Sequence, residues 1–351
     1  MKYFFIVQGE GMGHLTQSLA LRSILERNGH SVASTFIGTN FFRAANPLIK
    51  EEKCASFFSP VFLPRLDKKG IALIPTFIVN LLLAPLYIFS ICRIACKIRA
   101  SDADAIVVFY DIIGQLGSLL AFSGKPVYAI SHHFFFSHPV FKFPKERKIE
   151  RTLLLLHSHI ASLGAQRKIA LSFSDETSIP ENKLFVLPPL IRSEILENKE
   201  ITGDHVLVYS LQKGFLETVC TLAKRYPKKK FEVFLHSLNN EKKLPDNLSA
   251  FLVSKDGFMH SLLTSSMVIC TSGFETLTEA IYLNKPLIIV PSRNHFEQYC
   301  NSLDAKRIGA ASVFDDFNSI ELPEAKNNLA FVSFKEWIKK ADEMFLFHLS
   351  N

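Results

Sequence analysis

Short apolar runs alternate with longer amphipathic segments along most of the chain. Residues 3–8 have the pattern of a buried strand, residues 15–28 carry apolar pairs at helical spacing, and "HSVASTFIG" (30–38) predicts a second strand. Three further apolar runs follow at 103–111, 125–131 and 168–174. Short strands that are apolar throughout and separated by helices are typical of a parallel sheet covered on both faces.

The alternation stops near residue 188 and starts again near residue 205. The segment between them, "PPLIRSEILENKEITGDH", is rich in proline and charge, which is typical of a linker. Four more strands are then predicted at 205–211, 231–237, 266–272 and 285–291. We therefore expect an α/β protein with two Rossmann-like domains and a cleft between them. The expected parts are a first domain over 1–188, a linker over 189–203, a second domain over 204–325 and a closing helix within 326–351.

Length and composition fit this organisation. The chain has 351 residues, of which 48% are hydrophobic, enough for two cores. The six cysteines form no CxxC pair, so we expect reduced core residues in a cytoplasmic protein, and no secretory signal peptide is recognised. The net charge of +7 favours anionic partners. Nucleic acid is not expected, because the basic residues are not interleaved with aromatic residues in a recognisable module.

The loop "GEGMGH" lies where the first strand should pass into the first helix. Its glycines, Gly9, Gly11 and Gly13, permit a tight turn and the close approach of a ligand. The loop is not a dinucleotide fingerprint, because no third glycine follows at the spacing of GxGxxG and Glu10 would repel a pyrophosphate. A ligand site at the carboxyl ends of the strands is nevertheless expected here.

His14 closes this loop and is a candidate general base. An imidazole is largely neutral near pH 7 and can remove a proton from a hydroxyl group. Asp111, at the end of the strand "IVVFYD", is a candidate for orienting the ring. The structural alternative stays open: His14 would only start a helix, and Asp111 would cap the amino end of the next one.

The segment 270–302 carries the second candidate site. It predicts a strand, a turn of Thr271, Ser272 and Gly273, and a helix with Glu275 and Glu279 on its polar face. Backbone amides at the start of that helix suit a diphosphate, and Glu279 suits two ribose hydroxyls. The alternative is that both glutamates are simply solvated.

These residues resemble a known family. "SGFETLTEAIYLNKPLIIVP", "FEQYCNS" and "GEGMGHLTQSLAL" are similar to segments of GT-B glycosyltransferases, above all the group that contains the lipid-linked N-acetylglucosaminyltransferase of peptidoglycan synthesis. The resemblance extends over nearly the whole chain. It implies a hexosyltransferase that takes a sugar from a UDP-sugar, inverts the anomeric centre and needs no metal or other cofactor.

The resemblance also implies roles for single residues. His14 would be the base, Glu279 would bind the donor ribose, and Ser272 and Gly273, next to Thr271, would hold the diphosphate. The donor sugar would contact Gln298 with Glu297 beside it, and Phe258 would offer backbone contacts to the base of the nucleotide. Arg293 and Lys213 are candidate cations for the leaving diphosphate.

Two positions depart from the patterns of related enzymes. The glycine-rich turn of the family is here "YSLQKGF", with Gly214 alone, which puts phosphate contacts from that loop in doubt. Retaining GT-B enzymes carry a second glutamate eight residues before the first, whereas Thr271 precedes Glu279 by that distance. This difference favours inversion.

The uncharged run 71–92 raises the question of a membrane. It is long enough to span a bilayer, but a span would place strands of one sheet on opposite sides. Two interpretations stay open: a helix buried against the sheet, or an apolar patch that lies with Arg93, Lys97 and Arg99 on an anionic membrane at its inner face. The second suits a lipid-linked acceptor or a cell-envelope glycan.

The segment 131–151 contains three histidines and a basic cluster. His132, His133 and His138 lack the spacing of zinc ligands, so we expect no metal there and instead a loop that shapes the acceptor site. Acceptor phosphates or lipid headgroups are candidate partners of the basic cluster, whose alternative is a solvated helix face. Its members are Lys142, Lys145, Arg147, Lys148 and Arg151.

Two rival functions remain at this point. A nucleotide-sugar epimerase uses the same fold without a separate acceptor. A non-catalytic protein that binds a nucleotide or tethers to a membrane would follow if the departures in "YSLQKGF" abolish donor binding.

Overall fold

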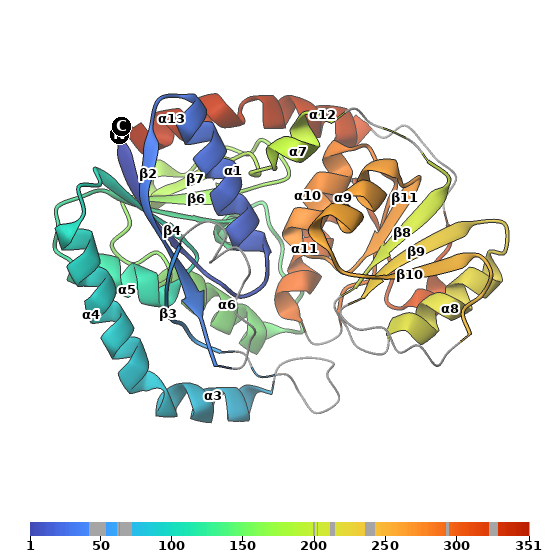
Figure 1. The fold of residues 1–351 in the computed structure, drawn as a ribbon, viewed down its shortest axis with the longest axis horizontal. Coiled ribbons are helices and arrows are strands. Elements are labelled where there is room, and N and C mark those ends of the chain that lie inside the picture. The colour runs from blue at the N-terminus through green and yellow to red at the C-terminus, as the bar shows by residue number, and fades with distance from the viewer. Residues whose placement is uncertain are drawn as a thin grey trace. The chain divides into compact units, whose positions relative to one another are not determined.

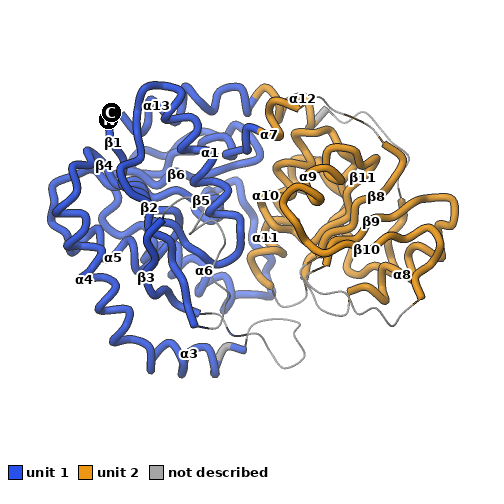
Figure 2. The backbone as a smooth tube through the Cα atoms, in the orientation of Figure 1, with its two compact units in different colours: residues 1–63, 71–193, 337–351 blue, residues 64–70, 194–336 orange. Residues whose placement is uncertain are grey.

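The computed structural model describes residues 1–41, 54–61, 63, 72–198, 201, 203–210, 215–235, 243–292, 295–322 and 329–350. The chain forms two compact units, which Figure 2 distinguishes by colour. Unit 1 contains Met1–Leu63, Ile71–Ser193 and Trp337–Asn351, and unit 2 contains Glu194–Glu336. The boundary between Ser193 and Glu194 lies inside the expected linker.

Unit 1 is built on a parallel sheet of seven described strands (Figure 1) in the order β3-β2-β1-β4-β5-β6-β7. This order reverses between β1 and β4, as in doubly wound folds. The strands are β1 (Lys2–Val7), β2 (Ser31–Thr39), β3 (Ala55–Phe58), β4 (Ala105–Phe109), β5 (Val127–Ser131), β6 (Arg167–Leu171) and β7 (Leu184–Leu187). The α-helices between them are α1 (Gly13–Arg27), α3 (Leu73–Leu82), α4 (Ala84–Ala100), α5 (Ile112–Leu120) and α6 (Lys148–Ile160). Short 3-10 turns occur at η1 (His132–Ser137) and η2 (Pro180–Asn182).

Unit 2 repeats the same architecture with six described strands in the parallel order β10-β9-β8-β11-β12-β13. The strands are β8 (His205–Tyr209), β9 (Lys230–Leu235), β10 (Leu248–Leu252), β11 (Met267–Cys270), β12 (Leu287–Ile289) and β13 (Ser312–Val313). The helices are α7 (Ser193–Leu196), which begins at the unit boundary, α8 (Phe215–Arg225), α9 (Lys255–Thr264), α10 (Phe274–Tyr282), α11 (Phe296–Arg307) and the 3-10 turn η3 (Phe317–Ser319). The predicted α/β class with two Rossmann-like halves is therefore confirmed.

The central strands form because their residues are apolar on both faces. All five residues of β4, "AIVVF", are buried, and only the first residue of β1 is exposed. On one face, Ile94 and Ile98 of α4 join a cluster with Phe4 and Val108. Each side chain of this size contributes about 1.5–3 kcal/mol when it leaves water. The alternation of apolar runs and amphipathic segments thus specifies a sheet with helices on both faces.

The apolar run 71–92 is not one buried helix. It forms α3 and the start of α4, which bend by 59° with respect to each other, and Pro85 lies in the first turn of α4. In the described chain, no single helix has the length and apolar character of a bilayer span, whereas the bent pair passes the same test by length and composition. The expectation of a helix buried against the sheet fails for α3, because Ile74, Phe77 and Leu82 are 74%, 69% and 74% exposed.

The carboxyl-terminal segment forms two helices rather than the single closing helix expected. These are α12 (Leu329–Lys339) and α13 (Ala341–Ser350), which are separated at Lys340. The predicted apolar face is buried, with Trp337 and Phe345 at 3% and 0% exposure. The Trp337 indole Nε1–H donates to the carbonyl of Ser172 over 2.9 Å, which fastens the end of the chain to unit 1.

The cysteines follow the expectation only in part. All six are free thiols, and Cys270 and Cys300 are buried as predicted. Cys92 and Cys96, however, are exposed on α4, so the expectation that they pack in a core was wrong. Their spacing of four residues places them together on a helix face, but that face points to solvent.

Candidate active site

Three central strands of unit 1 end side by side at one edge of the sheet. β1, β4 and β5 are neighbours, and each is followed directly by polar or aromatic residues. These are the loop before α1, then Tyr110 after β4, and His132 and His133 after β5. The carboxyl edge at a reversal of strand order is where ligands bind in doubly wound folds. The residues after these strands form the candidate site of unit 1.

The glycine loop is shaped by two close constraints. A Cβ atom on Gly9 would lie 1.7 Å from the carbonyl oxygen of Gly38 at the end of β2, so only glycine fits there. Gly11 has a φ of +78°, which glycine adopts without the strain that a side chain would cause. The loop then enters α1 at Gly13, so that His14 lies in the first turn of the helix.

His14 is buried, with 7% of its surface exposed, and its Nδ1 lies 3.2 Å from Oε1 of Gln17. An amide oxygen only accepts hydrogen bonds, so Nδ1 carries the ring proton in this arrangement. Nε2 then keeps its lone pair, which is the form that a general base requires. Gln17, 1% exposed, is a partner of this candidate base that the sequence reasoning missed. Its spacing of three residues from His14 on a helix is the signal that would have found it.

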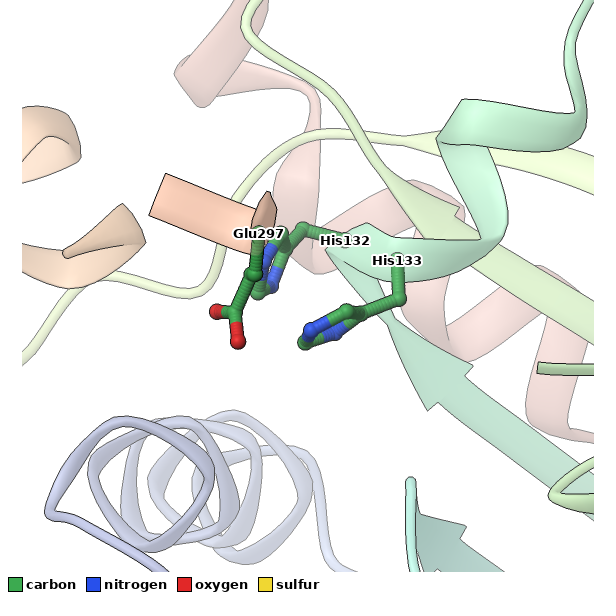
Figure 3. Close-up of side chains that lie close together, drawn as sticks. All are labelled: His132, His133 and Glu297. Atoms are coloured by element: carbon green, nitrogen blue, oxygen red, sulfur yellow. The ribbon is translucent and has the colours of Figure 1, made fainter. Parts of the chain in front are cut away.

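Aromatic and imidazole rings surround His14. Its ring centroid lies 5.7 Å from that of Tyr110, 6.2 Å from that of His132 and 5.7 Å from that of His133. Tyr110 stacks on His133 at 4.0 Å, and Nδ1 of His133 is 2.8 Å from Oγ of Ser131. Figure 3 shows the two neighbouring imidazoles at the start of η1. These rings line one side of the candidate base, and the role of the loop in shaping an acceptor site stays a prediction.

Asp111 does not orient His14. Its Oδ1 accepts the backbone N–H of Gly114 at 2.6 Å, and its Oδ2 lies 3.3 Å from Oγ of Ser59. Among the described residues, its hydrogen-bond partners do not include His14. The residue is the N-cap of α5, which is the structural alternative. The expected pairing of His14 with Asp111 was therefore wrong, because the carboxylate of Asp111 accepts hydrogen bonds at the amino end of α5 instead.

Burial of Asp111 has a consequence for stability. Burial raises the pKa of this carboxyl from 3.8 to about 7, against the opposing hydrogen bonds from Gly114, Ser59 and Ile113. The folded protein then binds the proton more tightly than the unfolded chain between these two pH values. Stability from this group is present at low pH and is lost as the pH rises from about 4 to about 7.

We expect Asp111→Asn to remove this loss. The asparagine keeps an oxygen for the Gly114 N–H but cannot ionise. The melting temperature of the variant minus that of the wild type should therefore rise between pH 4 and pH 7, as measured by thermal unfolding. Asp316→Asn, at the partly exposed N-cap of η3, controls for the exchange itself. A difference that stays constant with pH would contradict the raised pKa.

A zinc site of three histidines does not form. His138 uses both ring nitrogens inside unit 1, since Nε2 lies 2.9 Å from the carbonyl oxygen of Thr177 and Nδ1 accepts the N–H of Val140 at 3.3 Å. Its ring stacks on Phe135. His138 therefore fixes the loop after η1 and does not join the other two histidines.

Unit 2 holds a second candidate site of its own, at the turn between β11 and α10. The N–H of Gly273 donates to the carbonyl of Thr271 over 2.8 Å, which tightens the turn. The hydroxyl of Ser272 donates to the carbonyl of Gln298, so this side chain is committed to the fold. The N-cap of α10 is Gly273, which has no side chain to cap the helix, and a Cβ on it would meet no described atom within 4 Å. The amino end of α10 thus offers backbone amides and open space.

The two glutamates of α10 have different environments. Glu275 lies in the first turn and is partly exposed. At this position the helix dipole stabilises its negative charge. Glu279 lies one turn further and is 1% exposed, so the idea that both are solvated is wrong. A carboxylate that is shielded from water forms strong hydrogen bonds with hydroxyl donors.

The start of α11 carries two further candidate residues of unit 2, Glu297 and Gln298. Glu297 lies in the first turn and is labelled in Figure 3. The side-chain oxygen of Gln298 accepts the N–H of Ser292 at 3.2 Å, so this amide is oriented by the preceding loop. Arg293, Lys213 and Gly214 lie outside the described residues.

Phe258 lies in α9, where its N–H already donates to the carbonyl of Ser254 over 3.0 Å. Its ring packs on Tyr209 at the end of β8, with centroids 4.6 Å apart. The expected backbone contact with a nucleotide base is therefore not available from this N–H.

A family model described as "Glycosyl transferase family 1" matches residues 125–329, more than half of the chain. The chain belongs to glycosyl transferase family 1. It is a glycosyltransferase of the GT-B fold, which agrees with the two parallel sheets and with the expectation from the sequence. No curated protein matches it by sequence.

Solved structures of glycosyltransferases share this fold. The glycotransferase of kitacinnamycin has a TM-score of 0.64 at 14% identity, with 99% of each chain covered. MurG of Acinetobacter baumannii has a TM-score of 0.58 at 15% identity, with 100% of this chain and 99% of that one covered. UGT2 of Phytolacca americana, complexed with UDP-2fluoro-glucose and pterostilbene, has a TM-score of 0.59 at 14% identity, with 97% and 89% covered.

Proposed function

We propose that this glycosyltransferase moves a hexose from a UDP-sugar to a hydroxyl group of a lipid-linked or cell-envelope acceptor, with inversion and without a metal. His14 takes the proton of the acceptor hydroxyl through Nε2. The acceptor oxygen attacks the anomeric carbon as the bond from that carbon to the diphosphate oxygen breaks, and UDP leaves. Attack from the face opposite the leaving group inverts the centre.

The observation that carries the proposal is the state of His14. Gln17 holds its Nδ1, and the ring lies at the carboxyl edge of β1, β4 and β5 among other rings. A base in the correct tautomer at the ligand edge of the sheet suits proton removal from a hydroxyl group. A histidine that only started a helix would not need a buried amide to fix its tautomer.

The donor half of the proposal rests on α10. Its uncapped amino end suits the negative charge of a leaving diphosphate without a metal. The buried carboxylate of Glu279, one turn further, suits the two hydroxyls of a ribose. A solved glycosyltransferase of similar fold is complexed with UDP-2fluoro-glucose, which supports UDP as the nucleotide.

We further propose that α3 and the start of α4 lie on the surface of an anionic membrane, at its cytoplasmic face. Their exposed side chains form an apolar elbow, defined by Ile74, Phe77, Ile78, Leu81, Leu82, Ile88 and Phe89, which are 50–74% exposed. Exposed apolar patches of this kind mark interaction surfaces. Arg93, Lys97 and Arg99, exposed further along α4, supply positive charge for acidic lipids. Binding of the protein to vesicles that contain acidic lipids tests this proposal.

Two polar side chains of α3, those of Thr76 and Asn80, point away from the apolar elbow and bind the chain at 61–63. The Asn80 side chain accepts the N–H of Val61 at 2.9 Å and donates to the carbonyl of the same residue over 2.8 Å. Thr76 is 8% exposed and accepts the N–H of Leu63 at 3.0 Å. A helix that covers the core of a soluble protein turns its apolar side chains inward and its polar ones outward, whereas α3 does the opposite. This orientation suits a helix that lies in a lipid interface.

The proposed donor is tested by calorimetric titration with UDP and with UDP-, GDP-, dTDP- and CMP-linked sugars. We expect selective binding of UDP-sugars, and a loss of about 10-fold or more in Glu279→Gln, because the amide cannot form two charge-assisted hydrogen bonds with the ribose. Glu321→Gln removes an exposed carboxylate of the same unit and should bind like the wild type.

Two results would contradict this assignment. Equal binding in Glu279→Gln would place the ribose elsewhere, and binding of no nucleotide would remove the donor half of the proposal. Release of an epimerised sugar in the absence of any acceptor would favour an epimerase over a transferase.

A further inference from the structure

Unit 1 contains a cavity of about 860 Å³ that does not belong to the candidate active site. It lies between α6 and the segment that runs from η1 to Lys145, and residues at the start of β6 and β7 also line it. Pockets that hold small ligands typically have volumes of about 300–1,000 Å³. The cavity is therefore large enough for a ligand with an extended apolar part.

One wall of the cavity is aromatic. The rings of Phe136 and Phe141 lie 4.7 Å apart, and those of Phe141 and Phe143 lie 4.9 Å apart at 85°. Leu155 and Leu184 add aliphatic surface. Side chains of this kind favour an apolar chain over water.

The charged lining is entirely positive. Lys142, Lys145, Arg151 and Lys168 line the cavity, and none of its lining residues is an aspartate or a glutamate. Lys142 donates to the carbonyl of Pro139, and Arg151 lies over the Phe143 ring at 4.9 Å. Cations that converge on one cavity without a lining carboxylate attract an anion.

Lys168 is the most buried of these four cations. It is the second residue of β6, is partly buried, and forms no side-chain hydrogen bond or ion pair with any described residue. Burial lowers the pKa of its ammonium group, and the nearby charge of Lys183 lowers it further. A half-buried lysine without a counter-ion is costly, and an anionic ligand would offset that cost.

The basic cluster recognised in the sequence therefore divides into two groups. Lys142, Lys145 and Arg151 line the cavity, whereas Arg147 forms an ion pair with Glu150 at 3.1 Å. Lys148 is an exposed residue at the start of α6. Three of the five residues thus line a ligand-sized space from its solvent-exposed rim.

We propose that this cavity binds an amphiphile with a phosphate or carboxylate head and an apolar chain. The head contacts Lys168 and the basic rim, and the chain lies along the phenylalanine wall. Ser158 lines the cavity, and its Oγ is 2.9 Å from the hydroxyl of Tyr110, whose ring stacks on His133. The bound amphiphile would thus lie one hydrogen bond away from the rings around His14. The proposal does not depend on sugar transfer.

Isothermal titration with dodecyl phosphate, below its micelle concentration, tests the site. Dodecanoate, dodecanol and inorganic phosphate separate the contributions of head and chain. We expect one dodecyl phosphate per chain, affinity for dodecanoate, and binding at least 10-fold weaker for dodecanol and for inorganic phosphate. Lys168→Met, which keeps the unbranched apolar stem of the side chain without its charge, should weaken the binding of dodecyl phosphate roughly 10-fold or more, because a hydrogen-bonded charge pair is lost.

Lys183→Met is the matched control, because Lys183 is a neighbouring lysine outside the cavity lining. It should bind like the wild type, and thermal unfolding should show both variants folded. The proposal is overturned if Lys168→Met binds as tightly as the wild type or if dodecanol binds as tightly as dodecyl phosphate. It is also overturned if Phe77→Ser/Leu81→Ser, in the apolar elbow, abolishes binding.

Discussion

His14→Ala is expected to reduce sugar transfer by about 10²–10⁴-fold, the range that a positioned acid or base contributes. The reason is geometric: the ring lies at the carboxyl edge of three central strands, and Gln17 keeps Nε2 free of a proton. The turnover number should fall, whereas UDP-sugar binding, assigned to unit 2, should not change. Initial rates of UDP release with acceptor present, together with donor titration, measure both quantities.

His30→Ala is the control for this variant. His30 directly precedes β2, at the amino edge of the same sheet, and its Nδ1 lies 3.0 Å from the amino terminus. This variant should turn over like the wild type. Thermal unfolding would separate a catalytic loss from a folding defect, since His14 is buried. Unchanged turnover in a folded His14→Ala protein would remove this residue from the mechanism.

Phe77→Ser/Leu81→Ser is expected to weaken binding to anionic vesicles by about 100-fold or more. Both side chains are exposed, at 69% and 63%, and each would contribute about 1.5–3 kcal/mol on entering an apolar environment. Co-sedimentation with vesicles of mixed neutral and acidic lipids gives the partition coefficient. Because Asn80 and Thr76 hold α3 from its other side, the double substitution should leave the fold intact.

Val332→Ser/Phe347→Ser is the matched control for the elbow. These two residues, in α12 and α13, are 62% and 59% exposed, so the variant removes similar apolar surface from another part of the chain. It should bind vesicles like the wild type. Equal losses in both double variants would show that the elbow is not the membrane surface. Binding to neutral vesicles as tight as to acidic ones would exclude a role for Arg93, Lys97 and Arg99.

The candidate site was predictable in its parts but not in its pairings. His14, the turn at Thr271–Gly273 and Glu279 were recognised as candidates from spacing and from resemblance. The structure places His14 in the first turn of α1, the turn directly before α10, and Glu279 inside α10. The partner of His14 was not predictable in the same way. Asp111 and Gln17 are both polar residues near this edge, and the choice depended on where two helices begin.

The strand pattern shows the same limit. Each strand predicted from an apolar run has its counterpart, whereas β3, β7, β10 and β13 were missed. These four are the edge strands of the two sheets, and they are two to five residues long. An edge strand pairs on one side only and is partly exposed, so it carries no long apolar run that a sequence pattern can reveal.

By itself, the sequence determined the α/β class, the division into two halves, the glycine loop and the central strands, because these depend on local periodicity and on backbone freedom. The tertiary structure alone decided which polar groups meet. It assigned Asp111 to the amides of α5 and Gln17 to His14, turned the apolar face of α3 outward, and gathered four cations around a cavity without a carboxylate. Hydrogen bonds and burial depend on distances between segments far apart in the chain, which no local pattern specifies.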